Sequence, residues 1–406
     1  MNFPPPEFSR PHAFPVVQDI PPRPELFMYL DIVVLALGLF LAAWFVLKKR
    51  SRFGVVAVMF GSLAYFGFWR KGCVCSIGSI QNVAQALFDP GYALTAAAAA
   101  FFLLPLAVTL FFGRVFCAAV CPHGAIQDLF LVKPVKLPAW LSRGLGFLPF
   151  VYLGATVLSA ANGSLYLICR YDPFVGIFRT SGPAFMLVAG GVVILLATVV
   201  GRPYCRFLCP YGALLRLLQP LSWRRAQITP TDCVVCTLCR DACPFDSVRQ
   251  PVPEPSAAER LRGRRRLAAA LLAMPVLAIV GGLAGYAMGP LFAQTARDVK
   301  LAQVVRQAES EVGGVSDPVA ADAFVRGGEE SEALYARAAA LERRFRHGSV
   351  VFGVWFGLVG GVLLAVYSRQ KVRKIFETDP SDCVACGRCF AFCPREQVRV
   401  QEIRKE

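Results

Sequence analysis

Seven runs of apolar residues, spaced along the whole chain, limit its possible folds more than any other feature. A helix crosses the hydrocarbon core of a bilayer in about 20 residues, and each run is close to that length, is almost free of charge and ends at Lys, Arg, Pro or Gly. Hydrophobic residues make up 56% of the 406 residues, against about 45–50% in soluble domains. The pattern predicts an all-α membrane protein with about seven transmembrane helices rather than a soluble protein with buried core helices. The runs are Phe27–Leu47, Phe53–Trp69, Leu94–Phe112, Leu145–Ala160, Ala184–Val200, Leu267–Met288 and Val350–Tyr367.

Basic residues predict how these helices are oriented. Loops rich in Lys and Arg stay on the cytoplasmic side, and the loop between the first two runs, Lys48–Arg52, carries four of them. With the amino terminus outside, alternation gives 29 Lys and Arg to the inner segments and 14 to the outer ones. We therefore expect a multi-pass protein of the bacterial inner membrane, and the net charge of +16 reflects topology rather than nucleic-acid binding.

The runs divide the chain into segments with different expected roles. The first 26 residues are rich in Pro and are expected to form a periplasmic tail, with the first apolar run acting as an uncleaved signal anchor. Two helical stripes, at 296–312 and 332–345, predict a periplasmic helical hairpin that is either a partner-docking surface or a solvated cap. The expected segments are a membrane domain at 27–220, the first half of a ferredoxin module at 221–255, a basic stop and transmembrane helix at 256–289, the hairpin at 290–349, a transmembrane helix at 350–367 and the second half of the module at 368–406.

Eight of the 15 cysteines fall into two runs with one spacing, Cys-x2-Cys-x2-Cys-x3-Cys-Pro. This is the run by which bacterial ferredoxins hold [4Fe–4S] clusters, whereas a zinc site needs only four tetrahedral ligands. The runs predict a small α+β ferredoxin-like module on the cytoplasmic side, where thiols stay reduced. The cysteines are Cys233, Cys236, Cys239 and Cys243 in the first run, and Cys383, Cys386, Cys389 and Cys393 in the second.

The fourth cysteine of each run is expected to serve the cluster of the other run. In two-cluster ferredoxins the fourth cysteine has this role, and the helix pair between the runs returns the chain to the same face of the membrane. One cluster is then expected to take Cys233, Cys236, Cys239 and Cys393. The other is expected to take Cys383, Cys386, Cys389 and Cys243.

The membrane domain contains an internal repeat with an offset of 88 residues. Gly113–Ala125 reappears as Gly201–Ala213, and each copy carries a Cys-x3-Cys-Pro motif. The four thiols, Cys117, Cys121, Cys205 and Cys209, are expected to meet at the inner membrane face if the copies pack together. They form either a third cluster site or two tight turns with inert thiols, and the sequence leaves both open.

The remaining candidates are three cysteines and one histidine. Cys73, Cys75 and Cys169 fall on the predicted outer side, where a disulfide from Cys169 to Cys73 or Cys75 is favoured over a redox site. His123 follows Cys121-Pro122 and is expected to be a surface residue rather than a ligand. The chain has three histidines, none within an apolar run, and no Cys-x-x-Cys-His motif, so the sequence predicts no haem.

These motifs resemble the NosR/NapH-like family of membrane-bound polyferredoxins, which serve nitrous oxide reductase and periplasmic nitrate reduction. The resemblance rests on the two repeat copies, the loop Asp172-Pro173-Phe174 and the two ferredoxin runs. It implies electron transfer between a quinone pool or cytoplasmic donor and a periplasmic acceptor. NosR-like proteins carry a large periplasmic flavin-binding domain before the membrane part, and only about 26 residues stand there in this sequence, so any flavin is expected on a partner.

The sequence therefore favours an electron-transfer component of an oxidoreductase system, with two [4Fe–4S] clusters, a third left open, and no catalytic residues of its own. The expected partners are the membrane, a periplasmic flavoprotein or reductase, and quinone as an open alternative. Two other functions remain: a metal-reducing maturation factor for a copper or haem enzyme, as in CcoG-like proteins, and a redox-sensing membrane regulator.

Overall fold

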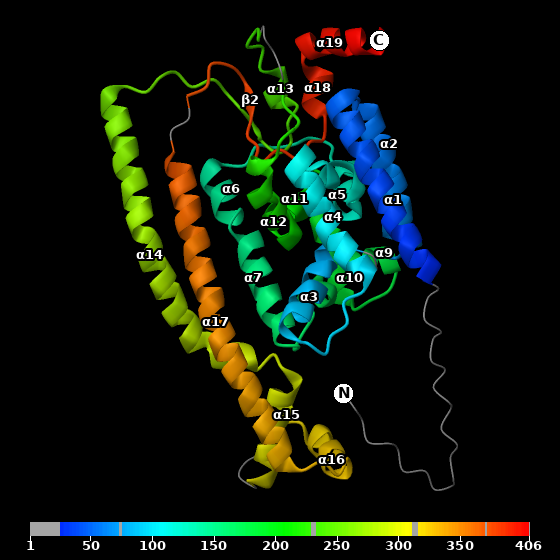
Figure 1. The fold of residues 1–406 in the computed structure, drawn as a ribbon, viewed down its shortest axis with the longest axis vertical. Helices are drawn as coiled ribbons and strands as arrows, with labels where there is room; N and C mark the ends of the chain where they lie inside the picture. Colours follow the sequence, from blue (N-terminus) through cyan, green and yellow to red (C-terminus); the bar gives the residue numbers. More distant parts are fainter. Residues whose placement is uncertain (1–24, 73–74, 229–232, 311–315, 370–371, 406) are drawn as a thin grey trace.

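The computed structural model describes residues 25–72, 75–228, 233–310, 316–369 and 372–405 (Figure 1). The predicted tail therefore lies outside the described residues, apart from its last two. The described chain is mostly helical, with one two-stranded sheet. Figure 1 shows a helical bundle with the ferredoxin-type segments at one end, namely α13 (Leu238–Asp241), β2 (Glu377–Thr378), α18 (Arg388–Phe392) and α19 (Pro394–Lys405). The helices α15 (Arg297–Glu309) and α16 (Pro318–Arg326) lie at the other end.

The first part of the chain builds the bundle from helices of unequal length. The apolar runs form the longer helices, because a helix satisfies its backbone polar groups internally and so needs no water around it. Two of them continue as π-helices, η1 after α1 and η2 after α2. The elements are α1 (Glu25–Ala43), η1 (Trp44–Lys48), α2 (Arg52–Ser62), η2 (Leu63–Trp69), α3 (Ser76–Phe88), α4 (Ala96–Phe112), η3 (Phe116–Val120), α5 (Pro122–Leu129), α6 (Ala139–Leu145), α7 (Leu148–Ala161), α8 (Leu167–Tyr171), α9 (Pro173–Arg179), α10 (Ala184–Ala197), α11 (Pro203–Phe207), α12 (Pro210–Leu218) and η4 (Gln219–Leu221).

Five helices of the described chain are long and apolar enough to cross a membrane, or six if the bent pair of α9 and α10 counts as one span. This supports a multi-pass membrane protein, whereas the expected seven full spans are not established. The run at 94–112 forms α4, which has only 17 residues, and the run at 184–200 forms α10, which has 14 and meets α9 at 103°. The five spans are Leu26–Lys48, Arg52–Trp69, Ala139–Ala161, Ala257–Ala293 and Ser331–Ser368.

Two long helices, α14 (Ala257–Ala293) and α17 (Ser331–Ser368), run side by side along one flank of the bundle (Figure 1). Their contact depends on glycine, because a Cβ at Gly285 would collide with the carbonyl of Ser349, and one at Gly357 with that of Leu277. Small residues allow such close helix packing within membranes. The basic stretch before the apolar run is the first part of α14 itself, which begins at a capping box of Ser256 and Glu259.

The predicted outer hairpin differs in detail from the structure. Its first helix is α15 (Arg297–Glu309), and a second short helix, α16 (Pro318–Arg326), was not expected. The stripe at 332–345 is not a separate helix, because α17 runs without a break from Ser331 into the apolar segment. No proline lies between the two parts, and a single glycine, Gly348, does not end the helix.

The two halves of the ferredoxin module meet in space although α14 and α17 lie between them in sequence. Strand β1 (Val248–Arg249) pairs antiparallel with β2 (Glu377–Thr378), with Val248 opposite Thr378. A further bridge joins Val252 and Arg373. The short helix α13 (Leu238–Asp241) packs against α18 (Arg388–Phe392), which leads into α19 (Pro394–Lys405).

Candidate iron–sulfur centres

The first group of thiols is drawn from both halves of the ferredoxin module. Cys233, Cys236 and Cys239 of the first run line a cavity of about 370 Å³. Cys393, which ends α18 in the second run, lines the same cavity. The structure thus brings together the four residues expected to share one cluster.

The second group likewise combines the first three cysteines of one run with the fourth cysteine of the other. Cys383, Cys386 and Cys389 line another cavity of about 370 Å³, together with Cys243 from the first run. The Cys243 thiol also lies 3.1 Å from the Ser247 hydroxyl. The two cavities are neighbours, since Cys389 and Cys239 are close enough for their charges to interact.

The backbone of the two runs curls around these cavities in the same way. Val235 and Thr237 flank the second cysteine of the first run with φ of 55° and 65°, and Ala385 and Gly387 flank that of the second run with 56° and 75°. Residues other than glycine rarely take this left-handed conformation. Such turns direct successive N–H groups toward one concave side, an arrangement that binds anions and iron–sulfur clusters.

The donor set fits [4Fe–4S] clusters better than single ions. A zinc ion needs four ligands converging on one point, and within the described ranges no three His, Cys, Asp or Glu side chains converge in that way. A cubane takes one thiolate for each iron, so its ligands surround a cavity. Burial raises the pKa of Cys239 to about 11 and that of Cys383 to about 12, so these thiols keep their protons at neutral pH until metal displaces them.

The four cysteines of the repeat form a third group. Cys117 lies on η3 and Cys205 on α11, while Cys121 and Cys209 stand at the N-termini of α5 and α12. Cys121 is close enough to each of the other three for their charges to interact. Three of the four are buried, and Cys205 is half-buried.

The two copies of the repeat exchange arginines. Arg202 of the second copy reaches the first, where its Nη1 lies 3.0 Å from the point that a Cβ on Gly124 would occupy. At the equivalent position, Nη2 of Arg114 lies 3.5 Å from the corresponding point on Gly212. The copies therefore pack as a pair, as the repeat predicted.

Cys121 lies deeper in the helical bundle than the inner ends of the spans, where we expected the repeat cysteines. Val120, next to Cys121, packs 3.5 Å from the Cβ position of Gly38, halfway along the span Leu26–Lys48. Its carbonyl also accepts a hydrogen bond from Ser62, near the middle of the span Arg52–Trp69. Cys121 is therefore level with the middle of both spans.

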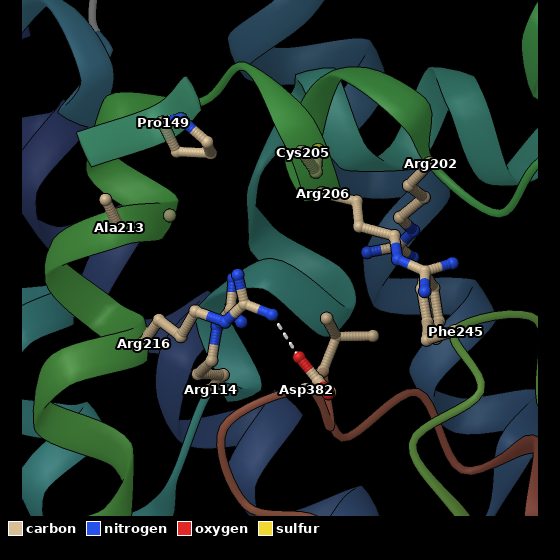
Figure 2. A pocket seen from close by; sticks show the side chains of 11 residues that line it. Arg114, Pro149, Arg202, Cys205, Arg206, Ala213, Arg216, Phe245 and Asp382 are labelled. Atoms are coloured by element: carbon tan, nitrogen blue, oxygen red, sulfur yellow. Dashed lines mark hydrogen bonds and ion pairs between the residues drawn. The ribbon is translucent and has the colours of Figure 1, made fainter. Parts of the chain in front are cut away.

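A strongly basic cavity of about 440 Å³ lies between the repeat and the second ferredoxin run (Figure 2). Four arginines and one carboxylate line it: Arg114, Arg202, Arg206, Arg216 and Asp382. Arg202 donates to the carbonyls of Cys117 and Ala118, and Arg114 lies 3.8 Å from the Cys117 sulfur. Buried cations need nearby negative charge, which clusters with four thiolates would supply on both sides of this cavity.

A buried carboxylate, Asp128 on α5, joins the repeat to the ferredoxin module. It pairs with Arg52 at 2.7 Å, Arg388 at 3.3 Å and Arg202 at 3.5 Å. Burial alone would raise its pKa, but the three guanidinium groups hold the pKa of Asp128 well below its usual range. Arg388 lies within the second ferredoxin run, and Arg52 also donates to the carbonyl of Cys386 at 2.7 Å.

Asp382, directly before the second run, makes a contact in which the charges are reversed. Here the ferredoxin module supplies the carboxylate and the membrane domain supplies the arginine. Arg216 on α12 pairs with Asp382, and Arg249 donates to its second oxygen at 2.8 Å. Sequence reasoning missed Asp128, Arg202 and Arg216. In the sequence, the Gly-Arg pair that begins each repeat copy is the feature that could have indicated the buried arginines, Arg114 and Arg202.

The expectation that His123 lies at the surface was wrong, because its side chain is 1% exposed. Its Nε2 lies 3.1 Å from Asp172, which also accepts a hydrogen bond from the Tyr204 hydroxyl at 3.0 Å. Asp172 in turn caps α9 through the backbone N–H of Phe174. The histidine therefore fastens the loop 162–173 to the repeat.

The outer cysteines are only partly described, since Cys73 lies outside the described residues. Cys75 caps α3 and accepts a hydrogen bond from the Ile77 N–H at 3.3 Å. Cys169 on α8 is close enough for its charge to interact with that of Cys75, but no disulfide joins these two described residues, so one of the two favoured pairings is not formed in this structure. Cys75 also interacts in this way with Cys121 of the repeat.

Comparison with known proteins identifies the repeat segments as a cluster-binding domain. The family model described as a 4Fe-4S binding domain matches residues 94–147 and 182–228, which hold the two Cys-x3-Cys-Pro motifs. The chain thus binds [4Fe–4S] clusters. No solved structure matches the chain.

Curated relatives point to the same class. The putative electron transport protein YccM of Escherichia coli is 26% identical over 41% of this chain and 52% of its own length. Protein NirI of Paracoccus denitrificans is 29% identical over 34% and 22%, and the regulatory protein NosR of Pseudomonas aeruginosa is 27% identical over 50% and 30%. The chain spans about half the length of YccM and less of the other two. The resemblance is supported: the chain carries a [4Fe–4S] binding domain and is similar both to NosR and to a putative electron transport protein.

Proposed function

We propose that the chain carries single electrons through three [4Fe–4S] clusters, from a cytoplasmic donor or the quinone pool to a redox partner on the periplasmic side. The clusters supply one-electron exchange, and the protein tunes them by charge, hydrogen bonding and burial. The proposed ligand sets are Cys233, Cys236, Cys239 and Cys393 for the first, Cys383, Cys386, Cys389 and Cys243 for the second, and Cys117, Cys121, Cys205 and Cys209 for the third.

The observation that carries this proposal is the continuity of the three cysteine groups. The first and second groups are linked by the proximity of Cys239 and Cys389. The second group shares Phe245 and Val384 with the arginine-lined cavity, which Cys205 also lines. A path therefore leads from the ferredoxin module to the middle of the transmembrane helices.

The arginines between the second and third groups give this path an electrostatic role. A reduced cluster carries one more negative charge than an oxidised one, and nearby cations stabilise that charge most where water is excluded. Arg114 and Arg202 are 5% and 1% exposed. Both are expected to raise the potential of the third cluster and so to draw electrons into the membrane.

Metal analysis of the purified chain tests the cluster number. Four thiolates per cubane predict about twelve irons and about twelve sulfides per chain, and about eight if the repeat is empty. A value near four would overturn even the two ferredoxin clusters. Replacing Cys243 with Ala is expected to damage the cluster held by the second run and to spare that of the first, as seen by paramagnetic resonance; the reverse pattern would contradict crossed ligation.

Reporter fusions test the proposed orientation. The excess of Lys and Arg in the inner segments supports a cytoplasmic ferredoxin module. Fusions after Arg266 and at the carboxyl terminus are both expected to behave as cytoplasmic. A periplasmic signal from either would reverse the direction proposed here.

A regulatory role is the second candidate, since one relative is named a regulatory protein. A sensor would change its affinity for a partner with cluster state, while an electron carrier would turn over many times. Steady electron flow across proteoliposomes from an inner reductant to an outer acceptor supports the carrier. A redox-dependent change in partner affinity without such flow supports the sensor.

A further inference from the structure

The path of cysteine groups does not end in the middle of the membrane. Cys75 and Cys121 line one small cavity of about 250 Å³, whose other walls include Leu35, Phe66 and Phe101. Cys209 of the repeat is also close enough to interact with Cys75. One thiol outside the three proposed ligand sets therefore lies directly beside the third.

A second thiol continues from Cys75 toward the outer end of the bundle. Cys169 on α8 packs over the first turns of α3, with its sulfur 3.7 Å from the Cβ position of Gly78. Gln81, which is fully buried, donates to this sulfur at 3.4 Å and accepts from the Ile168 N–H at 2.8 Å. One buried amide thus holds Cys169 over the helix that Cys75 caps.

The two thiols differ in access. Cys169 is exposed, whereas Cys75 is half-buried. Figure 1 shows α3 at the end of the bundle away from α13 and α18. An exposed thiol next to a less accessible one is the arrangement by which dithiols exchange with disulfides of other proteins: the first attacks and the second resolves.

We propose that Cys75 and Cys169 form a redox-active thiol–disulfide pair, which takes electrons from the third cluster and delivers them to a disulfide of a protein on the outer side. The inference rests on the proposed function and names the exit of its path. It differs from the structural disulfide that the sequence favoured, because a structural disulfide keeps its electrons through every cycle.

The exchange balances in two stages. The oxidised pair accepts two electrons, in two successive one-electron transfers, together with two protons; the S–S bond breaks and two thiols result. The Cys169 thiolate then attacks the partner disulfide, which breaks to give a mixed disulfide. Cys75 attacks the Cys169 sulfur, the original S–S bond re-forms, and the partner leaves as a dithiol with the two electrons and two protons.

The test uses the full chain in lipid nanodiscs, reduced anaerobically by a photoreduced deazaflavin, with the pair followed by differential alkylation and peptide mass spectrometry. In the oxidised protein we expect a Cys75–Cys169 disulfide. After reduction of the clusters we expect at least tenfold more free Cys169 in the wild type than in Cys383→Ser, in which the second cluster is lost and the path is broken. Equal reduction in both would mean that the reductant acts directly, and would overturn the proposal.

Further outcomes are equally decisive. A bond that persists after full cluster reduction, or one that joins Cys169 to Cys73, would overturn the proposal in favour of a structural disulfide. Two thiols in both states with an extra bound metal would overturn it in favour of a metal site. In Cys75→Ser, Cys169 is expected to trap a disulfide-containing probe peptide as a stable adduct, which the matched variant Cys169→Ser cannot form.

Cluster spectra separate this inference from the proposed function. Cys169→Ser is expected to keep all the cluster signals of the wild type. If clusters are present and reducible while the pair stays unchanged, only the exit proposal fails. If the clusters cannot be loaded or reduced at all, the proposed function fails with it.

Discussion

The two copies of the repeat share a backbone plan but differ in the charge that they offer the ferredoxin module. Three residues after the first copy stands Asp128, and at the equivalent position after the second copy stands Arg216. Asp128 meets Arg388, and Arg216 meets Asp382. Arg388 lies in the second ferredoxin run and Asp382 directly precedes it, so one short segment carries a cation toward one copy and an anion toward the other.

This difference in charge shows how two nearly equivalent repeat copies can bind the second ferredoxin run in a single orientation. If both copies carried the same charge, the run could dock in either of two orientations at similar cost. With opposite charges, the wrong orientation would place Arg388 against Arg216 and Asp382 against Asp128. Like charges so close, and partly buried, cost far more than exposed ones, so the pattern selects one orientation.

The largest expected effect comes from the Cys-x3-Cys-Pro motif that both copies share. Cys117→Ala and Cys205→Ala are each expected to abolish electron flow and to lower iron from about twelve to about eight per chain. The double variant should be no worse than either single one, because members of one site are not additive. Normal flow in either variant would mean that the copies do not hold a common cluster.

The next largest effect is on stability, and it concerns the opposite charges of Asp128 and Arg216. Asp128→Asn leaves three arginines without their buried carboxylate, and the expected loss of stability is about 3–5 kcal/mol. Arg216→Gln leaves Asp382 with Arg249 as a partner, and about 1–3 kcal/mol is expected. Urea titration of the ferredoxin cluster signals in detergent measures both losses. Equal losses would remove the case for an oriented docking.

The pH dependence of the unfolding free energy tests whether Asp128 stays ionised in the folded protein. The pKa of Asp128 is lowered in the folded protein, so its stabilising contribution is present above the unfolded value of about 3.9 and is lost only as the pH falls through the folded pKa. The difference in unfolding free energy between wild type and Asp128→Asn should therefore stay constant between about pH 5 and 8. A marked decline of that difference within this range would show that the carboxylate is not held ionised.

The smallest expected difference between the two copies lies at the paired glycines, Gly124 and Gly212. A Cβ on Gly124 would stand 3.0 Å from Arg202 and 3.2 Å from the Cys117 carbonyl, whereas one on Gly212 would stand 3.1 Å from the Cys205 carbonyl and 3.5 Å from Arg114. Gly124→Ala is expected to cost about 1–3 kcal/mol, and Gly212→Ala less. Thermal loss of the third cluster signal compares them, and a larger effect at Gly212 would contradict the packing described.

The parts of this molecule that the sequence predicted are those with a local pattern. Apolar length identified the long helices, and cysteine spacing predicted which thiols of the ferredoxin module line the same cavity, since both properties follow from positions along the chain. The depth of Cys121 and the burial of His123 depend on how η3 packs against α1 and α2 and how α5 packs against α2, which no local pattern encodes. The seven full spans are not established, because α4 and α10 are apolar but short, and α10 is bent sharply against α9.

The short pairing of β1 with β2 has a consequence for how the protein is made. With the proposed crossed ligand sets, neither ferredoxin cluster has all four ligands until the second run has been synthesised, and the last of these ligands, Cys393, lies about 150 residues after Cys243. At about 5–20 residues per second, the first run waits roughly 8–30 s, during which α14 and α17 must enter the membrane and turn back. Loading of the two ferredoxin clusters would then report that the intervening hairpin has been inserted correctly, and a chain whose hairpin failed to insert would lack both of these clusters and stay open to proteolysis.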